Sequence, residues 1–202
     1  MAAQKIKITV RNFGEMTAEL YADKAPKTVE NFLTLVDKGF FSGMIFHRVI
    51  SGFMIQGGGY DESFGEKEAD AIAGEFAANG FLQNDLKHTR GVLSMARTSD
   101  PNSASSQFFI MHKDAPYLDK QYAGFGCVTE GIEVVDKIAA VPTDRYDRPY
   151  EDVMIISVKP LNVELQQAPA DTVAVQPEEE PMPAEAIRSD AAVTAMKTED
   201  KR

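Results

Sequence analysis

The stretch Phe46-His-Arg-Val-Ile-Ser-Gly-Phe-Met-Ile-Gln-Gly-Gly58 contains most of two short predicted strands, at residues 44–50 and 53–56. Six further segments have the composition or alternation of strands, at residues 5–10, 16–20, 91–96, 107–112, 125–128 and 152–159. Helical spacing of apolar residues predicts two helices, over residues 26–38 and 132–139. Eight short strands without strand–helix–strand alternation predict an all-β protein, either an antiparallel barrel or a sandwich.

The order of side chains along these strands predicts an apolar patch on the outer surface of the sheet. Successive side chains of a strand point to opposite faces, so Phe108 and Ile110 share one face, whereas Phe109 and Met111 share the other. If Phe108 and Ile110 fill the core and the strands are neighbours, five side chains meet outside: Arg48, Met54, Gln56, Gln107 and Phe109. Such a patch is typical of a binding site. In the alternative, a helix covers Phe109 and Met111.

The histidines and the glycine run do not form a catalytic or metal-binding motif. His47 has inward parity and no carboxylate or nucleophile near it in the sequence, which favours a hydrogen-bonded core histidine over a catalytic one. His88 and His112 lack the spacing of a metal site. The run at 57–59 lacks the Lys-Ser/Thr ending of a phosphate loop, so we interpret it as a tight turn. We therefore expect no metal or cofactor. The sequence also shows no nucleophile–base pair, which argues against a hydrolase.

Composition limits the class of protein and of partner. The chain has 202 residues and a formal net charge of −10, which argues against a nucleic acid or an anionic membrane as partner. No segment reaches the ~20 apolar residues of a membrane span, and the N-terminus lacks the apolar region of a secretory signal. The single cysteine, Cys127, cannot form an intramolecular disulfide. We expect a cytoplasmic monomer.

The end of the chain differs in composition from the rest. Residues 163–202 contain nine acidic and four basic residues, four of the ten prolines, no glycine and no aromatic residue. Such a segment cannot bury enough apolar surface to offset the entropy of ordering it. We interpret residues 1–162 as one folded domain and residues 163–202 as a disordered acidic tail. The alternative is a partner-docking segment with a short helix at 184–197.

Four sequence blocks together resemble the cyclophilin-type peptidyl-prolyl cis-trans isomerases. The opening stretch is similar to the defining motif of that family, and three further blocks match in order and separation: Gly91-Val-Leu-Ser-Met-Ala96, Ser106-Gln-Phe-Phe-Ile110, and Leu118 followed by Phe125-Gly126. The resemblance covers residues 5–160. It implies a closed eight-stranded antiparallel barrel capped by two helices, with a substrate groove on its outer face. It also implies catalysed rotation about X-Pro bonds in peptides and in unfolded or partly folded proteins, which assists protein folding.

The resemblance also assigns roles to individual residues. Arg48 matches the catalytic arginine, and Gln56 and Gln107 match residues that orient it and hold the substrate backbone. The pocket for the proline ring corresponds to Phe53, Met54, Phe109 and Leu118, with Ala96 as a groove-wall residue. Three substrate-binding positions differ from well-known members: Tyr117 replaces a tryptophan, Tyr122 a histidine and Arg97 an asparagine. The changes at Tyr117 and Tyr122 predict weak cyclosporin binding at most, and Arg97 adds positive charge beside the groove. A proline-peptide binding module with little catalysis is the alternative, but the presence of Arg48 and the apolar pocket favours the isomerase.

Overall fold

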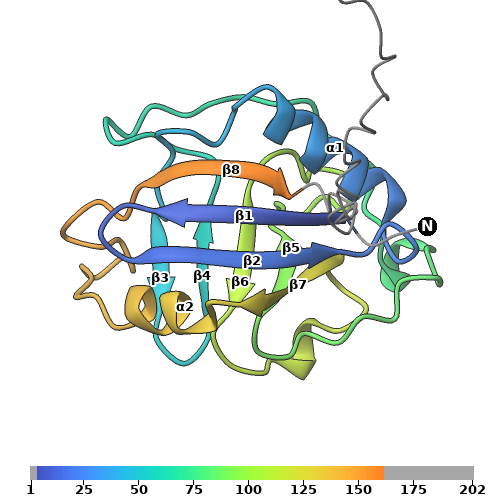
Figure 1. Cartoon of the computed structure of the whole chain (residues 1–202). Coiled ribbons are helices and arrows are strands. Elements are labelled where there is room, and N and C mark those ends of the chain that lie inside the picture. The colour runs from blue at the N-terminus through green and yellow to red at the C-terminus, as the bar shows by residue number, and fades with distance from the viewer. Residues whose placement is uncertain (1–3, 162–202) are drawn as a thin grey trace, which may run out of the picture. The chain divides into compact units, whose positions relative to one another are not determined.

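The computed structural model describes residues 4–161, and Figure 1 shows the arrangement of the elements in this part of the chain. The strands are β1 (Gln4–Val10), β2 (Gly14–Leu20), β3 (Arg48–Ile50), β4 (Met54–Gly57), β5 (Val92–Met95), β6 (Phe108–Met111), β7 (Gly124–Glu130) and β8 (Ile155–Leu161). The helices are α1 (Pro26–Asp37) and α2 (Ile132–Ala139), with short 3-10 turns η1 (Ala77–Asn79) and η2 (Pro116–Leu118). The predicted all-β class, its eight strands and its two helices are confirmed.

The strands form one antiparallel sheet in the order β3-β4-β6-β5-β7-β2-β1-β8. The sheet folds over on itself, so that β1, β2 and β8 cross in front of β3, β4 and β6 in Figure 1. Within residues 4–161 the edge strands β3 and β8 do not pair along their length. The segment before β3 meets the start of β8 through one isolated bridge, Ile45 with Met154, and through short backbone hydrogen bonds. The amides of Phe46 and Gly43 donate to the carbonyls of Val153 and Ile155, both at 2.9 Å, and the Ile155 amide donates to the Met44 carbonyl at 2.7 Å.

The sheet is therefore open between β3 and β8, and the predicted closed barrel is wrong in this respect. The reason lies in the segment before β3, where Met44, Ile45 and Phe46 are buried in succession. A regular strand would turn every second side chain outward. Three consecutive side chains fill the end of the core here, so this segment does not form the regular strand whose hydrogen bonds with β8 would close the barrel.

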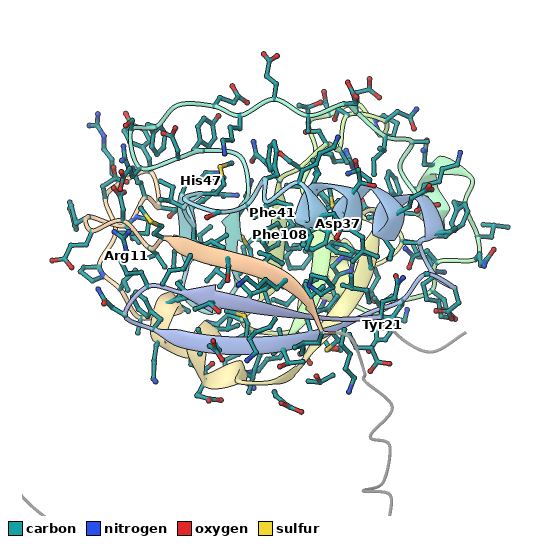
Figure 2. The ribbon with its side chains drawn as sticks, turned by 45° about the horizontal axis from the view of Figure 1, so that its top comes forward. Arg11, Tyr21, Asp37, Phe41, His47 and Phe108 are labelled. Carbon is teal, nitrogen blue, oxygen red and sulfur yellow. The ribbon has the colours of Figure 1, made fainter. Side chains whose placement is uncertain are left out.

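The core lies between the two halves of the folded sheet and is rich in phenylalanine. Phe32 of α1 packs on Phe41 at 4.9 Å between ring centroids, on Phe108 at 5.4 Å and on Phe125 at 5.1 Å. Figure 2 shows Phe41 and Phe108 beside one another in this interior, and their ring centroids are 5.6 Å apart. Helix α1 thus covers one opening of the folded sheet with its apolar face.

The predicted faces of β3, β4 and β6 are confirmed at the residues that form regular strand. Val49, Ile55 and Ile110 pair across the three strands and belong to the interior core. The prediction fails one residue earlier, because β3 begins only at Arg48. Phe46, and not His47, is buried in the interior. His47 packs outside this core against the ring of Tyr60, at 4.8 Å between centroids.

The prediction of an acidic tail, and part of the prediction that no segment spans a membrane, concern residues whose structure is not described. The predicted acidic tail at 163–202 lies outside the described residues. Within residues 4–161, no helix has the length and apolar character needed to cross a bilayer.

Candidate active site

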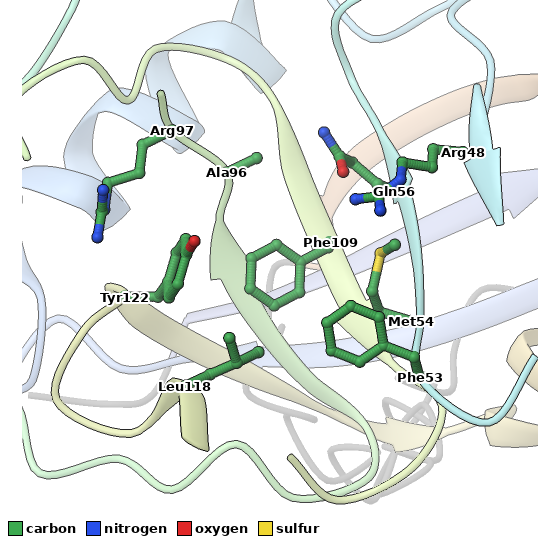
Figure 3. A pocket seen from close by; sticks show the side chains of 9 residues that line it. All are labelled: Arg48, Phe53, Met54, Gln56, Ala96, Arg97, Phe109, Leu118 and Tyr122. Atoms are coloured by element: carbon green, nitrogen blue, oxygen red, sulfur yellow. The ribbon is translucent and has the colours of Figure 1, made fainter. Parts of the chain in front are cut away.

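A pocket of about 260 Å³ opens on the outer face of β3, β4 and β6 (Figure 3). Strand register creates it, because Arg48 lies opposite Gln56, and Gln56 lies opposite Phe109. Residues directly opposite one another in a sheet point to the same face. Nine side chains line the pocket: Arg48, Phe53, Met54, Gln56, Ala96, Arg97, Phe109, Leu118 and Tyr122.

The floor of the pocket is apolar and largely buried. Phe109 lies in the middle of Figure 3, with Leu118 and Tyr122 on one side and Met54 and Phe53 on the other. The Phe109 residue is 5% exposed, and it packs with Met54 and Leu118 in a cluster separate from the interior core. No α-helix of residues 4–161 lines this pocket. The chain that follows β6 packs Ala115 and Leu118 with Met111, which is fully buried, whereas Phe109 lines the pocket.

A polar edge borders this floor. Gln56 Nε2 donates a hydrogen bond to Gln107 Oε1 at 3.0 Å. Arg48 Nε lies 3.5 Å from Asp147 Oδ2, and the Arg48 side chain is 44% exposed. The guanidinium is therefore held at one end by a carboxylate while its other nitrogen atoms face the pocket opening. This places a permanent cation beside a buried aromatic floor.

Asp147 is a member of the site that sequence reasoning missed. Its backbone has a φ of 64°, a left-handed conformation that an L-residue adopts at a cost of roughly 1–2 kcal/mol. The Asp144 carboxylate accepts the amides of Tyr146 and Arg148, and the Asp147 carbonyl accepts the Val49 amide at 2.8 Å. The tight turn thus places Asp147 next to β3 and beside Arg48. The run Asp144-Arg-Tyr-Asp147 in the sequence has turn-forming residues, but nothing in it indicates which strand the turn meets.

Arg97 lines the pocket but does not offer a free charge to it. Its guanidinium stacks on the ring of Tyr122 at 4.6 Å and on that of Phe76 at 5.1 Å. The same group donates to the carbonyls of Thr98 and Gln121. In Figure 3 its side chain extends past Tyr122, away from Phe109. Arg97 therefore holds the Tyr122 wall in place.

Two predicted site residues lie next to the pocket and do not line it. Gln107 borders a neighbouring hollow of about 230 Å³, which it shares with Gln56, Ala96 and Arg97. The Tyr117 ring lies 5.9 Å from that of Phe53 and is 63% exposed, so it belongs to the rim. The structure thus brings the predicted residues into one neighbourhood, and their individual roles stay predictions.

Comparison with known proteins agrees with this geometry. Residues 5–160 match the family model described as cyclophilin type peptidyl-prolyl cis-trans isomerase/CLD. The chain belongs to this family. It is 48% identical over 157 residues to the peptidyl-prolyl cis-trans isomerase of Acinetobacter baylyi, an alignment that covers 73% of this chain and 81% of that protein. It is 44% identical over 159 residues to peptidyl-prolyl cis-trans isomerase B of Escherichia coli, covering 73% and 94%.

Solved structures show the same relationship. A cyclophilin type peptidyl-prolyl cis-trans isomerase of Cryptosporidium parvum matches with a TM-score of 0.67 and 30% identity, over 79% of this chain and 98% of that chain. The same enzyme in the presence of the dipeptide Ala-Pro matches with a TM-score of 0.66 and 31% identity, over 77% and 98%. The chain is a cyclophilin-type peptidyl-prolyl cis-trans isomerase.

A hydrogen-bonded chain lies behind the floor of this cyclophilin's pocket. His88 Nε2 is 2.9 Å from Ser94 Oγ, and His88 Nδ1 is 3.3 Å from Asp119 Oδ1. The expectation that no nucleophile–base pair exists is therefore wrong, since a serine, a histidine and an aspartate are connected in that order. Ser94 is fully buried, however, and the His88 ring stacks behind Phe109 at 6.1 Å. The chain supports the floor and does not present a nucleophile to substrate.

Burial favours the neutral form of His88 in this position. Removal from water lowers its pKa, and the hydrogen bond and negative charge of Asp119 oppose that effect in part. Among residues 4–161, no three His, Cys, Asp or Glu side chains are grouped as a metal site would require. The polar chemistry available in the pocket is that of the Arg48 guanidinium and the Gln56 amide beside an apolar floor, with Gln107 hydrogen-bonded to Gln56 at its edge.

Proposed function

We propose that the pocket holds the substrate proline on the floor formed by Phe53, Met54, Phe109 and Leu118 while Arg48 stabilises the twisted X-Pro bond. The observation that carries this proposal is the single row of Arg48, Gln56 and Phe109 across β3, β4 and β6. It puts the cation and the ring site on the same face of the sheet. The structural neighbour in the presence of Ala-Pro gives the class of ligand for this proposal.

Rotation about a prolyl bond requires stabilisation of a distorted amide and no bond cleavage. Resonance makes the barrier about 18–20 kcal/mol, so uncatalysed exchange takes tens to hundreds of seconds. In the twisted state the amide nitrogen loses its conjugation and gains a lone pair. A guanidinium can donate to that nitrogen or to a nearby carbonyl oxygen, and it stays protonated. The buried apolar floor also disfavours the charge-separated planar amide.

Arg48 and the apolar pocket each contribute part of the rate acceleration. One well-placed donor stabilises a transition state by about 3–4 kcal/mol, which corresponds to roughly two to three decades in rate. Further acceleration comes from holding the proline side fixed while the other side rotates. Asp147 on one side of Arg48 and the hydrogen-bonded pair Gln56–Gln107 on the other keep this polar edge ordered. Gln107 then offers its remaining amide atoms to the substrate backbone.

The test is exchange of an Ala-Pro peptide measured by NMR, which needs no coupled protease. We expect Arg48→Ala to lower turnover at least roughly tenfold, a barrier change of a little over 1 kcal/mol. Because Arg48 is largely at the surface, the free energy of unfolding should change little. Arg11→Ala removes an exposed arginine from the turn between β1 and β2 and serves as the control. Unchanged exchange in Arg48→Ala would leave a proline-binding module as the better description.

The wider role of the enzyme is also a proposal. We infer that it acts on unfolded or partly folded chains as well as on peptides, and so assists folding in the cytoplasm as a monomer. The pocket is open to solvent at the Tyr117 rim, which leaves room for chain on either side of the proline. Tyr122, clamped by Arg97, stands where well-known members have histidine, which supports the prediction of weak cyclosporin binding.

A further inference from the structure

The turn between β3 and β4 carries one wall of the pocket. The Phe53 amide donates to the Ile50 carbonyl at 3.0 Å, which closes a four-residue turn. Gly52 is the third residue of this turn and has a φ of 78°, as a type II turn requires. Phe53 follows directly and projects its ring to the pocket (Figure 3). The position of that ring therefore depends on what holds the turn.

His112, the residue after β6, holds this turn at two points. Its backbone amide donates to the Phe53 carbonyl at 2.9 Å. Its side chain accepts the amide of Gly52 at Nδ1, also at 2.9 Å. Only a neutral ring with its proton on Nε2 has a lone pair on Nδ1 to accept this bond. The side chain is 13% exposed, so few water molecules compete for the Gly52 amide.

The other nitrogen of the imidazole, Nε2, lies near a carboxylate that is itself paired with an arginine. His112 Nε2 lies 3.4 Å from Asp136 Oδ1 of α2, and Asp136 Oδ2 lies 2.6 Å from Arg90. The hydrogen bond and positive charge of Arg90 hold the pKa of Asp136 below its usual range, so this carboxylate stays ionised. Asp136 therefore places a negative charge beside Nε2, on the side of the ring away from the Gly52 amide.

We propose that His112, in its neutral Nε2–H form, is a positioning residue that fixes the Phe53 wall of the proline pocket. A protonated ring carries a proton on both nitrogen atoms and cannot accept the Gly52 amide. Protonation thus removes the one side-chain contact by which His112 holds the turn and leaves the backbone bonds to Phe53 in place. This inference rests on the proposed role of Phe53 in binding the proline ring.

The charged groups around the ring come from three segments. Asp136 faces it from α2, Arg90 from the segment before β5, and Lys113 and Asp114 from its own segment. The turn itself, Ser51-Gly-Phe53, contributes no titratable side chain. Of the other two histidines, His47 has its pKa lowered to about 4, chiefly by burial, and burial lowers the pKa of His88 as well. Neither gains a proton as readily as an ordinary histidine.

The experiment compares the full-length enzyme with His112→Ala and His112→Asn from about pH 5 to about pH 8, the interval in which histidines titrate. The probe is an Ala-Pro peptide, with kcat and KM measured separately. In the unaltered enzyme we expect KM to rise about fivefold toward the acid end, the value of one ordinary hydrogen bond. His112→Ala should show the raised KM at every pH. His112→Asn keeps an acceptor for Gly52, so it should restore KM and flatten the profile.

NMR gives a second measurement that a general loss of stability would not reproduce. The Gly52 amide resonance should shift with the same midpoint as KM, and this titration should vanish in His112→Asn. A KM that is independent of pH in the unaltered enzyme, or an acid inflection that persists in His112→Asn, would overturn the proposal. If His112→Ala fails to fold, the other two proteins still decide the matter.

Phe53→Ala separates this inference from the proposed function. A raised KM in Phe53→Ala together with an unchanged KM in His112→Ala would remove the role of His112 and leave the pocket assignment intact. An unchanged KM in Phe53→Ala would instead contradict the assignment of Phe53 to the proline site.

Discussion

His47 is held neutral beside the cation that the proposed mechanism uses. Its imidazole packs on Tyr60, and its Nδ1 atom is buried and has no hydrogen-bond partner within residues 4–161. The predicted hydrogen-bonded core histidine is therefore wrong at this atom as well as in its location. Burial, followed by the positive charge of the neighbouring Arg48, lowers the pKa of His47 to about 4. A second cation next to Arg48 is thus avoided over most of the physiological range.

This pKa predicts that stability depends on pH in a defined interval. The unfolded chain takes up the proton at about pH 6.5, the ordinary value for histidine, whereas the folded chain resists it down to about pH 4. The contribution of neutral His47 is complete above about pH 6.5 and is lost as the pH falls toward 4, up to roughly 3 kcal/mol. His47→Phe keeps the ring contact and cannot titrate.

Urea unfolding of both proteins at several pH values isolates this effect. We expect the free energy of unfolding of the unaltered enzyme to fall relative to His47→Phe between these two pH values. Parallel curves would show that His47 is as easily protonated in the folded state as in the unfolded chain, and the burial argument would be wrong.

At the scale of elements, α1 depends on a capping group that is distant in sequence. No side chain adjacent to its first turn caps it. The buried carboxylate of Glu75 accepts the amides of Lys27 and Thr28 and the hydroxyl of Thr28, at 3.0, 2.8 and 2.8 Å. A negative charge at the N-terminus of a helix is favourable because the first amides lack partners within the helix.

Glu75→Ala should lower the free energy of unfolding by roughly 2–4 kcal/mol, since the buried amide and hydroxyl of Thr28 and the partly buried amide of Lys27 lose their acceptor. Glu75→Gln retains an acceptor oxygen and should lose less. Glu15→Ala, which breaks the exposed pair with Lys7, is the matched control and should change stability by less than about 1 kcal/mol. The measurement is urea unfolding at neutral pH. A loss in Glu75→Ala no larger than in the control would show that water caps the helix equally well.

The elements also show what the sequence could predict. Alternation along β4 and β6 predicted the shared face of Gln56 and Phe109, because neighbouring strands transmit a local pattern without further information. The pattern failed at Phe46 and His47, where burial at the end of the sheet overrides strand geometry.

Contacts between distant loops could not be predicted from one sequence. Asp147 reaches Arg48 through a turn, and Asp119 reaches His88 across 31 residues. Glu75 caps α1 across 47 residues. In each case the partner is fixed by where a loop passes over the sheet, and neither spacing nor residue type contains that information.

All residues of the proposed active site belong to the described part of the chain, residues 4–161. The pocket side chains come from residues 48–122, and Asp147 and Asp136 add support from later segments. Residues 163–202, predicted to be an acidic tail, carry −5 of the formal net charge of −10. Any influence of that segment on catalysis by electrostatics alone should be weak, because exposed charges are screened beyond about 8 Å at physiological salt.

We therefore expect deletion of residues 163–202 to leave turnover of a neutral Ala-Pro peptide unchanged at about 0.15 M salt. A lysine-containing peptide is the sensitive probe, since acidic charge attracts it and raises its rate of association only when screening is weak. Its kcat/KM should fall in the shortened enzyme at low salt, and the difference should disappear as salt is added. A several-fold change for the neutral peptide, independent of salt, would mean that residues 163–202 contact the pocket or its substrate directly, and the division of the chain at residue 162 would then be wrong.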